Sequence, residues 1–313
     1  MKDKISIIIP FLNEADSFSQ LHSGMIDPLL TLDQFEFELV FVNDGSTDRS
    51  VEVLSKADFK GIESRVVSLS RNFGAHNAVF AGLSHTTGKY ITALSGDFQD
   101  NVDVIVALHN EVVKGADVVF PLRRTMAQSP MVKFFSNMYA SLMRRFAISN
   151  YPKQNFDTFF FNEKVKKAVI ETYELNSSLF LHVWTLGFKQ AYIQYDRKER
   201  KFGKSKWTLG KKIKLFVDSF IAFSYAPIRF VTYTGILFFM VGVMWTIYIT
   251  ARKLIYDDLQ EGWPMLTSIL LLGFGLTNIS LGIIAEYLWR TLDASRKKPV
   301  YIIDEVIELE KKK

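Results

Sequence analysis

The chain has 313 residues, a net charge of +5 and no cysteine. The absence of thiols excludes disulfide bonds and thiolate metal sites, and the length allows one α/β domain of ordinary size with an appendage. Much of the positive charge lies in residues 197–214 and 290–298, which flank long uncharged segments. This placement favours attraction to anionic lipid over nucleic-acid binding. A solvated basic face without a specific partner is the alternative.

Short apolar runs alternate with helical patterns from the start of the chain. The expected strands are residues 6–9, 39–42, 65–69, 90–94 and 118–121, and helices are expected at about 75–86 and 102–114. This alternation predicts an α/β fold whose mainly parallel, Rossmann-like sheet is covered by helices on both faces.

Polar segments follow the first four expected strands, at residues 10–14, 43–48, 71–74 and 95–100. In sheets of this kind the ligand binds outside the carboxyl ends of the strands, so these segments are the candidate site. Dinucleotide binding through Gly-x-Gly-x-x-Gly and phosphate binding through Gly-x-x-x-x-Gly-Lys-Ser/Thr are excluded, because neither motif occurs.

Two of these segments contain candidate ligand groups. Asp44 follows the second strand, where a carboxylate can accept hydrogen bonds from a nucleoside; taken alone, its segment also reads as a turn and helix N-cap. Asp97 and Gln99 lie two residues apart after the fourth strand, which favours an oxygen-ligand site for Mg²⁺ or Mn²⁺ against a diphosphate.

Two uncharged stretches, residues 230–251 and 262–285, are each long enough to cross a bilayer as a helix. Buried core helices are the alternative, which the lack of a polar stripe disfavours. The basic flanks place the large domain and both termini in the cytoplasm. Between 208 and 223, apolar residues at helical spacing oppose lysines, which predicts a helix in the membrane interface or, alternatively, one packed on the soluble domain.

The expected organisation therefore has four parts. They are a domain at 1–207, an amphipathic interfacial region at 208–226, a two-helix transmembrane hairpin at 227–290 and a cytoplasmic tail at 291–313.

Together these segments resemble the family 2 glycosyltransferases of the GT-A fold. The two expected spans narrow the resemblance to polyprenyl-phosphate glycosyltransferases of the bactoprenol glucosyltransferase type, which are related to dolichol-phosphate mannose synthase. It covers nearly the whole chain and is carried by residues 7–14, 42–48, 71–74, 96–100, 200–207 and 286–301.

The resemblance implies roles for particular residues. For the nucleotide-sugar they are Pro10, Asn13, Glu14, Asp44, Arg71 and Asp97; for the metal, Asp97 and Gln99; for the lipid phosphate and diphosphate, Arg200, Lys204, Ser205 and Lys206. Catalysis is assigned to Asp97, Asp157 and Arg200, with Asp157 near the acceptor; a capping or surface role for Asp157 stays open. His76, close to the 71–74 segment, is a further candidate for contact with substrate phosphate.

Three positions depart from the family pattern. Ser95 stands where an Asp-x-Asp motif has its first carboxylate, which implies lower metal affinity. Phe159 stands where relatives often have an arginine, which removes part of a phosphate clamp. Residues 101–103 replace a common Pro-Pro-Glu as a loop change without chemical consequence.

The resemblance implies an inverting enzyme that moves glucose or a related hexose from a UDP-sugar to undecaprenyl or another polyprenyl phosphate, for cell-envelope glycan modification. It also implies a plasma-membrane location and suggests a homo-oligomer. Two alternatives remain, a transferase acting on a saccharide or glycolipid hydroxyl and a catalytically silent membrane scaffold.

Overall fold

We analysed a computed structural model of the chain. It describes residues 2–96, 98, 102–123, 137, 138, 140–145, 148, 151, 156, 158–173, 178–195, 263–295 and 299–309, together with 233, 237, 240, 244, 251 and 255. The chain divides into two compact units, which are described separately. Unit 1 comprises residues 1–141, 150–219 and 299–313, and unit 2 comprises residues 142–149 and 220–298.

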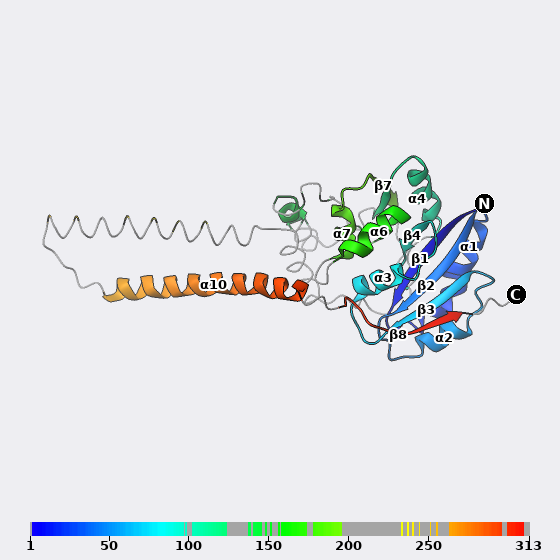
Figure 1. Cartoon of the computed structure of the whole chain (residues 1–313), viewed down its shortest axis with the longest axis horizontal. Helices are drawn as coiled ribbons and strands as arrows, with labels where there is room; N and C mark the ends of the chain where they lie inside the picture. Colours follow the sequence, from blue (N-terminus) through cyan, green and yellow to red (C-terminus); the bar gives the residue numbers. More distant parts are fainter. Residues whose placement is uncertain are drawn as a thin grey trace. The chain divides into compact units, whose positions relative to one another are not determined.

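Unit 1 is built on an eight-stranded sheet of order β7-β5-β6-β4-β1-β2-β3-β8 (Figure 1). The strands are β1 (Asp3–Phe11), β2 (Phe35–Asn43), β3 (Glu63–Leu69), β4 (Tyr90–Ala93), β5 (Val118–Arg123), β6 (Phe160–Asn162), β7 (Gln190–Tyr195) and β8 (Ile303–Leu309). Within the described chain, the pairings β1–β2, β1–β4, β2–β3 and β5–β7 are parallel, and β4–β6, β5–β6 and β3–β8 are antiparallel. The mainly parallel sheet and all five expected strands are confirmed.

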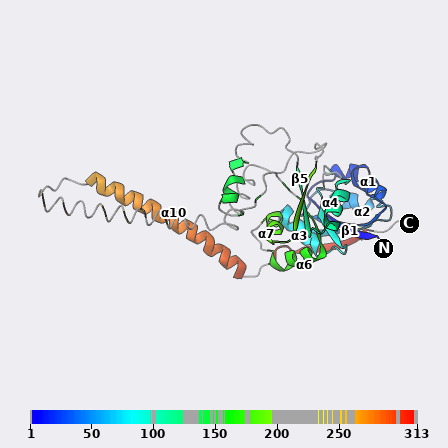
Figure 2. The same cartoon turned by 90° about the horizontal axis from the view of Figure 1, so that it is seen from above.

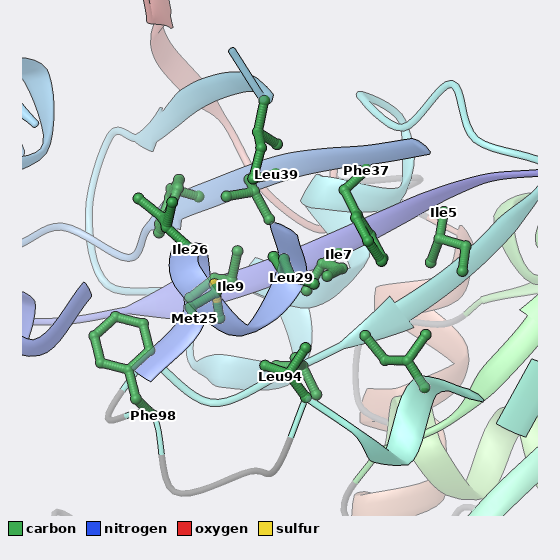
Figure 3. Close-up of a cluster of buried hydrophobic side chains, with 14 of the residues drawn as sticks. Ile5, Ile7, Ile9, Met25, Ile26, Leu29, Phe37, Leu39, Leu94 and Phe98 are labelled. Carbon is green, nitrogen blue, oxygen red and sulfur yellow. The ribbon is translucent and has the colours of Figure 1, made fainter. Parts of the chain in front are cut away.

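The central strands are apolar because both of their faces are buried. On β1, Ile7 and Ile9 point to one face, where they join a core with Met25 and Leu29 (Figure 3). Ile8 points to the other face, where it lies against Gly82. Strands covered on both sides read as continuous apolar runs, which is why the sequence pattern located them correctly.

Helices cover the two faces of the sheet (Figure 2). The first face carries η1 (Ser17–Gln20), η2 (His22–Ile26), α1 (Asp27–Thr31), α2 (Ser50–Lys56) and α4 (Val104–Val113). The second carries α3 (Ala75–Leu83), with α6 (Glu163–Thr172) and α7 (Leu179–Thr185) beside it. The two helices expected from the sequence correspond to α3 and α4, each slightly shorter than predicted.

The last described strand, β8, comes from the part of the chain predicted to be a tail. It pairs antiparallel with β3, with Val66 opposite Ile307 and Val67 opposite Val306, and Figure 1 shows it beside β3. Leu309 is buried in the sheet's core. Residues that follow unit 2 in the chain therefore complete the sheet of unit 1.

Unit 2 contains α10 (Trp263–Ser295), a helix of 33 residues. Within the described ranges, none of the helices is sufficiently long and apolar to traverse a bilayer. The predicted spans at 230–251 and 262–285 thus remain predictions, and most of the first one lies outside the described residues.

Candidate functional site

Four loops meet at the edge of the sheet where β1, β2, β3 and β4 have their carboxyl ends. The backbone N–H of Asp44, just after β2, donates to the Phe11 carbonyl at the end of β1, at 2.9 Å. A Cβ placed on Gly96, after β4, would lie 3.1 Å from the Pro10 carbonyl oxygen, so these two loops touch. This edge is where the sequence placed the site.

The loops after β1 and β2 are joined through Asn13. Its side-chain oxygen accepts the backbone N–H groups of Thr47 at 2.8 Å and Asp48 at 3.3 Å, while its own N–H donates to the Ser46 hydroxyl at 2.9 Å. Asn13 has φ of 51°, a left-handed conformation that asparagine tolerates better than most residues. Its side chain therefore stabilises the 46–48 turn.

Glu14 and Asp48 continue this link between the two loops. The Glu14 N–H donates to the Ser50 hydroxyl at 2.9 Å, and the Glu14 carboxylate accepts from Ser17 at 2.6 Å. Burial raises the pKa of Asp48, but hydrogen bonds from Ser50 and from the Ala15 N–H outweigh it, so the pKa lies below the usual value. Asp48 is thus ionised at neutral pH and bridges the loops as an acceptor.

Asp44 binds the loop after β3. Its carboxylate is buried, with the residue 4% exposed, and Oδ1 accepts the Phe73 N–H at 2.7 Å. The Gly74 N–H lies 3.2 Å from Oδ1 and 3.1 Å from Oδ2. The Asp44 carboxylate, which the sequence suggests as a hydrogen-bond acceptor for a nucleoside, therefore accepts backbone N–H groups at the start of α3. A negative charge is favourable at that end of a helix.

Gly45 lets the loops after β2 and β3 approach each other. It has φ of +76°, and an added Cβ would lie 2.7 Å from the backbone carbon of Arg71 and the backbone nitrogen of Asn72. Only glycine fits a position that combines this conformation with this backbone approach.

Arg71 is exposed beside these contacts. Its guanidinium carbon lies 4.3 Å from the centroid of the Phe73 ring, a cation–π arrangement that restricts its orientation. A planar guanidinium suits phosphate oxygens. The structure therefore brings Pro10, Asn13, Glu14, Asp44 and Arg71 to one edge of the sheet; the nucleotide roles assigned to them remain predictions.

The loop after β4 is anchored by Phe98. β4 ends at Ala93, and the Phe98 N–H donates to the Ser95 carbonyl at 3.1 Å. Phe98 is 7% exposed and has φ of 52°, which is rare for a bulky residue and indicates that its burial fixes the loop. Its ring lies beside Phe18 in the core, with centroids 6.1 Å apart, and Figure 3 shows it beside Met25.

The predicted metal ligands Asp97 and Gln99, on either side of Phe98, lie outside the described residues. Among the residues that are described, no group of three or more His, Cys, Asp or Glu side chains is arranged to hold a metal. The metal site remains a prediction.

The predicted acceptor-side residues also lie outside the described part of the chain; they are Asp157, Arg200, Lys204, Ser205 and Lys206. Two neighbours of Asp157 are described. The Thr158 hydroxyl donates to the Ala93 carbonyl at the end of β4. Phe159 is fully buried, with its ring 4.5 Å from that of Phe161, so this position serves the core.

His76 is held by a hydrogen bond and by a contact with an aromatic ring. Its Nδ1 accepts the Leu179 N–H at 3.2 Å, and its ring lies 4.9 Å from that of Phe180. Burial lowers the pKa of His76 to about 4. The His76 imidazole is therefore uncharged at neutral pH. The contact with substrate phosphate that the sequence suggested for His76 would lack an electrostatic attraction.

Two polar residues near the site were missed by the sequence analysis. The Asn77 amide donates to the Phe73 carbonyl at 2.9 Å, and the Tyr173 hydroxyl donates to the Asn77 side-chain oxygen at 3.1 Å. Neither follows a strand, and 96 positions separate them in the chain, so no local pattern connects them.

The sheet and its loops define an α/β domain with its site at the carboxyl ends of parallel strands. The sequence model described as glycosyl transferase family 2 matches residues 6–170. The chain belongs to glycosyl transferase family 2, and it is a transferase with the GT-A type of sheet expected from its sequence.

Individual relatives match over almost the whole chain. An uncharacterized glycosyltransferase, YkcC, of Bacillus subtilis is 30% identical, covering 98% of this chain and 95% of its own. A prophage bactoprenol glucosyl transferase homolog of Escherichia coli is 30% identical, covering 97% and 99%. An undecaprenyl-phosphate 4-deoxy-4-formamido-L-arabinose transferase of Sodalis glossinidius is 28% identical, covering 97% and 94%.

Proposed function

We propose that this protein transfers a hexose from a UDP-sugar to a polyprenyl phosphate, with undecaprenyl phosphate as the acceptor in the cell. The observation that carries the proposal is the similarity, over 97% of the chain, to relatives whose names specify bactoprenol or undecaprenyl phosphate. Those two names specify different sugars, glucose and a formamido-arabinose. We therefore commit to the acceptor class and treat glucose as the first donor to test.

The donor binds at the loops after β1, β2 and β3. Arg71 is a cation at this edge, and its exposed guanidinium is oriented by Phe73. A guanidinium binds phosphate oxygens through paired hydrogen bonds, which suits the diphosphate of a nucleotide-sugar. Asn13 and Glu14 shape the same edge through their contacts with residues 46–50.

Catalysis depends on positioning and charge, because a lipid phosphate is already ionised at neutral pH and needs little help from a base. Asp97 and Gln99 offer oxygen ligands for Mg²⁺ or Mn²⁺, which when bound neutralises charge on the leaving diphosphate. Arg200, with Lys204, Ser205 and Lys206, supplies further charge to the phosphates. The acceptor oxygen attacks the anomeric carbon opposite the leaving group, giving inversion, and Asp157 orients the acceptor or the sugar.

Anchoring at the cytoplasmic face of the plasma membrane would bring this site to its lipid substrate. Two features support it. The uncharged stretches at 230–251 and 262–285 are flanked by basic residues. On α10, large apolar side chains are between 41% and 64% exposed; they are Leu266, Ile269, Leu270, Leu281, Ile284, Leu288 and Leu292. Such surface is costly in water and stable against lipid.

The test is a transfer assay with the purified full-length protein, UDP-glucose and Mn²⁺, in parallel arms containing undecaprenyl phosphate, a soluble saccharide or no acceptor. Lipid-linked sugar formed only in the first arm supports the proposal. Transfer to the saccharide would establish the hydroxyl-acceptor alternative, and donor binding without turnover, across a panel of nucleotide-sugars, would establish the scaffold.

Asp97→Ala is expected to abolish transfer while leaving the thermal unfolding temperature within about 2 °C. Asp33→Ala is the matched control, because Asp33 is exposed and precedes β2 at the opposite end of that strand. Retained activity in Asp97→Ala would remove Asp97 from the mechanism.

A further inference from the structure

The two peptide groups that flank Phe73, in the loop after β3, are each held by a side chain. The Phe73 N–H donates to Asp44 at 2.7 Å, and the Phe73 carbonyl accepts from the Asn77 amide at 2.9 Å. Asn77 is in turn oriented by the Tyr173 hydroxyl, at 3.1 Å. We call Asp44, Asn77 and Tyr173 the Phe73 clamp.

The outer part of the clamp is fixed by packing. Tyr173 directly follows α6, where its N–H donates to the Val169 carbonyl at 3.0 Å. It is 9% exposed, its ring lies 4.4 Å from that of Phe80 on α3, and burial raises the pKa of its hydroxyl. The hydroxyl is therefore a protonated donor at any physiological pH, held in place by two helices.

The inner part of the clamp determines where Arg71 points. Phe73 carries the ring on which the Arg71 guanidinium stacks at 4.3 Å. Gly45 lies against the backbone between them, where an added Cβ would meet Arg71 and Asn72 at 2.7 Å. Rotation of the backbone at Phe73 would turn the ring and release the guanidinium, because Arg71 and Phe73 lie within three residues of the same loop.

We propose that Asn77 and Tyr173, together with Asp44, are positioning residues for the donor, and that they act by holding the backbone on both sides of Phe73 so that Arg71 is presented to the diphosphate. This inference rests on the proposed donor class. It gives Asp44 a role that is exercised through backbone amides, and it adds two residues, Asn77 and Tyr173, to the donor site. Pre-organisation of this kind lowers the entropic cost of binding.

The experiment is a double-mutant cycle measured as UDP binding to the purified full-length protein by calorimetry. Asn77→Ala and Tyr173→Phe are each combined with Arg71→Ala. Loss of one hydrogen bond of the clamp is expected to weaken UDP binding about three- to tenfold in an otherwise native protein. In the Arg71→Ala background the same changes are expected to weaken it less than about twofold, because the group they position is gone.

Matched controls separate this effect from general damage. Tyr192→Phe also removes a tyrosine hydroxyl, one that donates to Gln190 at 2.7 Å on β7. Asp58→Asn also removes a carboxylate that accepts a backbone N–H, that of Lys60 at 2.9 Å, and it is paired with Asp44→Asn. Both controls are expected to bind UDP as the wild type does, whereas Asp44→Asn is expected to bind at least threefold more weakly.

Amide hydrogen exchange of a peptide covering residues 70–80 gives a readout without nucleotide. Exchange at Phe73 and Gly74 is expected to accelerate in Asp44→Asn and Asn77→Ala, and to stay unchanged in Arg71→Ala. Equal losses of UDP affinity in the native and Arg71→Ala backgrounds would overturn the positioning role. If the wild type binds neither UDP nor UDP-glucose, the proposed function fails first, and this inference falls with it.

Discussion

The Nη2 atom of Arg65 lies 3.2 Å from Oε1 of Glu38, a carboxylate that is completely buried. Glu38 also accepts the Thr87 N–H at 2.7 Å and the Thr87 hydroxyl at 3.0 Å, and the Ser6 hydroxyl donates to it. Arg65 extends the network to Glu63 at 2.7 Å and to Glu308 on β8 at 3.6 Å. One buried charge pair thus ties β2 to β3, to the loop before β4 and to β8.

Glu38→Ala is expected to lower the free energy of unfolding by about 3–5 kcal/mol. The substitution leaves the largely buried Arg65 without its buried carboxylate partner and removes the acceptor of the Thr87 N–H. Chemical denaturation of the full-length protein measures the loss. Glu36→Ala is the control, since Glu36 is exposed on the same strand and should change stability by less than about 0.5 kcal/mol. Equal effects of the two substitutions would contradict the role of the network.

Strand β8 is expected to contribute to stability through its last residue. Leu309 is 8% exposed in the core, so Leu309→Ala should cost about 2–3 kcal/mol. Ile302→Ala removes a side chain that is 51% exposed just before the strand and should cost far less. The comparison is made by thermal unfolding, and a larger effect at Ile302 would show that β8 does not pack as described.

Alanine substitutions at Gly45 and Gly61 distinguish the cost of a strained backbone conformation from the cost of a steric clash between an added Cβ and neighbouring backbone. Both have positive φ, +76° and +83°, but an added Cβ meets backbone only at Gly45, with nothing within 4 Å at Gly61. Gly61→Ala is expected to cost about 1–2 kcal/mol, and Gly45→Ala about 2–5 kcal/mol. Only Gly45→Ala should also weaken UDP binding. Equal costs in unfolding experiments would mean that the two loops are not in contact.

His76 is expected to make stability depend on pH. Its pKa is about 4 in the folded protein against 6.5 as the reference value, because burial disfavours the imidazolium. As the pH falls from about 6.5 to 4 the unfolded chain takes up a proton that the folded state resists, so stability present above pH 6.5 is lost. The loss at His76 should be about 1–2 kcal/mol, since the side chain retains some exposure.

His76→Gln keeps an acceptor for the Leu179 N–H and should flatten this dependence in unfolding measurements between pH 4 and 7. Burial also lowers the pKa of His85 and His182, so a smaller slope is expected to remain. An unchanged slope in His76→Gln would show that His76 is not the responsible group.

Gly24 is expected to affect the loop proposed to hold the metal. A Cβ at this position would lie 2.9 Å from the Cβ of Phe98, so Gly24→Ala should displace the ring that anchors the loop between Asp97 and Gln99. The Mn²⁺ concentration for half-maximal transfer should rise about three- to tenfold. Gly273→Ala, in α10 with nothing within 4 Å, should leave that concentration unchanged. An unchanged Mn²⁺ requirement in Gly24→Ala would show that the position of Phe98 does not affect metal binding.

The central sheet could be predicted because its physical cause is local. Strands buried on both faces must be apolar along their length, and β1 to β5 each show such a run. β6 has only three residues, and β8 mixes charged and apolar side chains as an edge strand, so neither stands out from a loop or tail. The pairing of β8 with β3 joins residues far apart in the chain.

The meeting of the candidate loops at one edge of the sheet was predictable for a similar reason. Loops after parallel strands share one edge of the sheet, which brought Asn13, Asp44 and Arg71 together as expected. The partners of these side chains were not predictable, because whether Asp44 faces a ligand or the Phe73 amide depends on how the loop after β3 folds back. Tyr173 joins the site through helix packing that no local pattern encodes.

The position of β8 also constrains how the protein is made. Residues 303–309 cover the edge of β3, yet they leave the ribosome only after residues 220–298 of unit 2. Until then, the nascent domain carries an unpaired β3 edge that can recruit another chain. The β3 edge is therefore open to pairing with another chain until residues 303–309 have been synthesised.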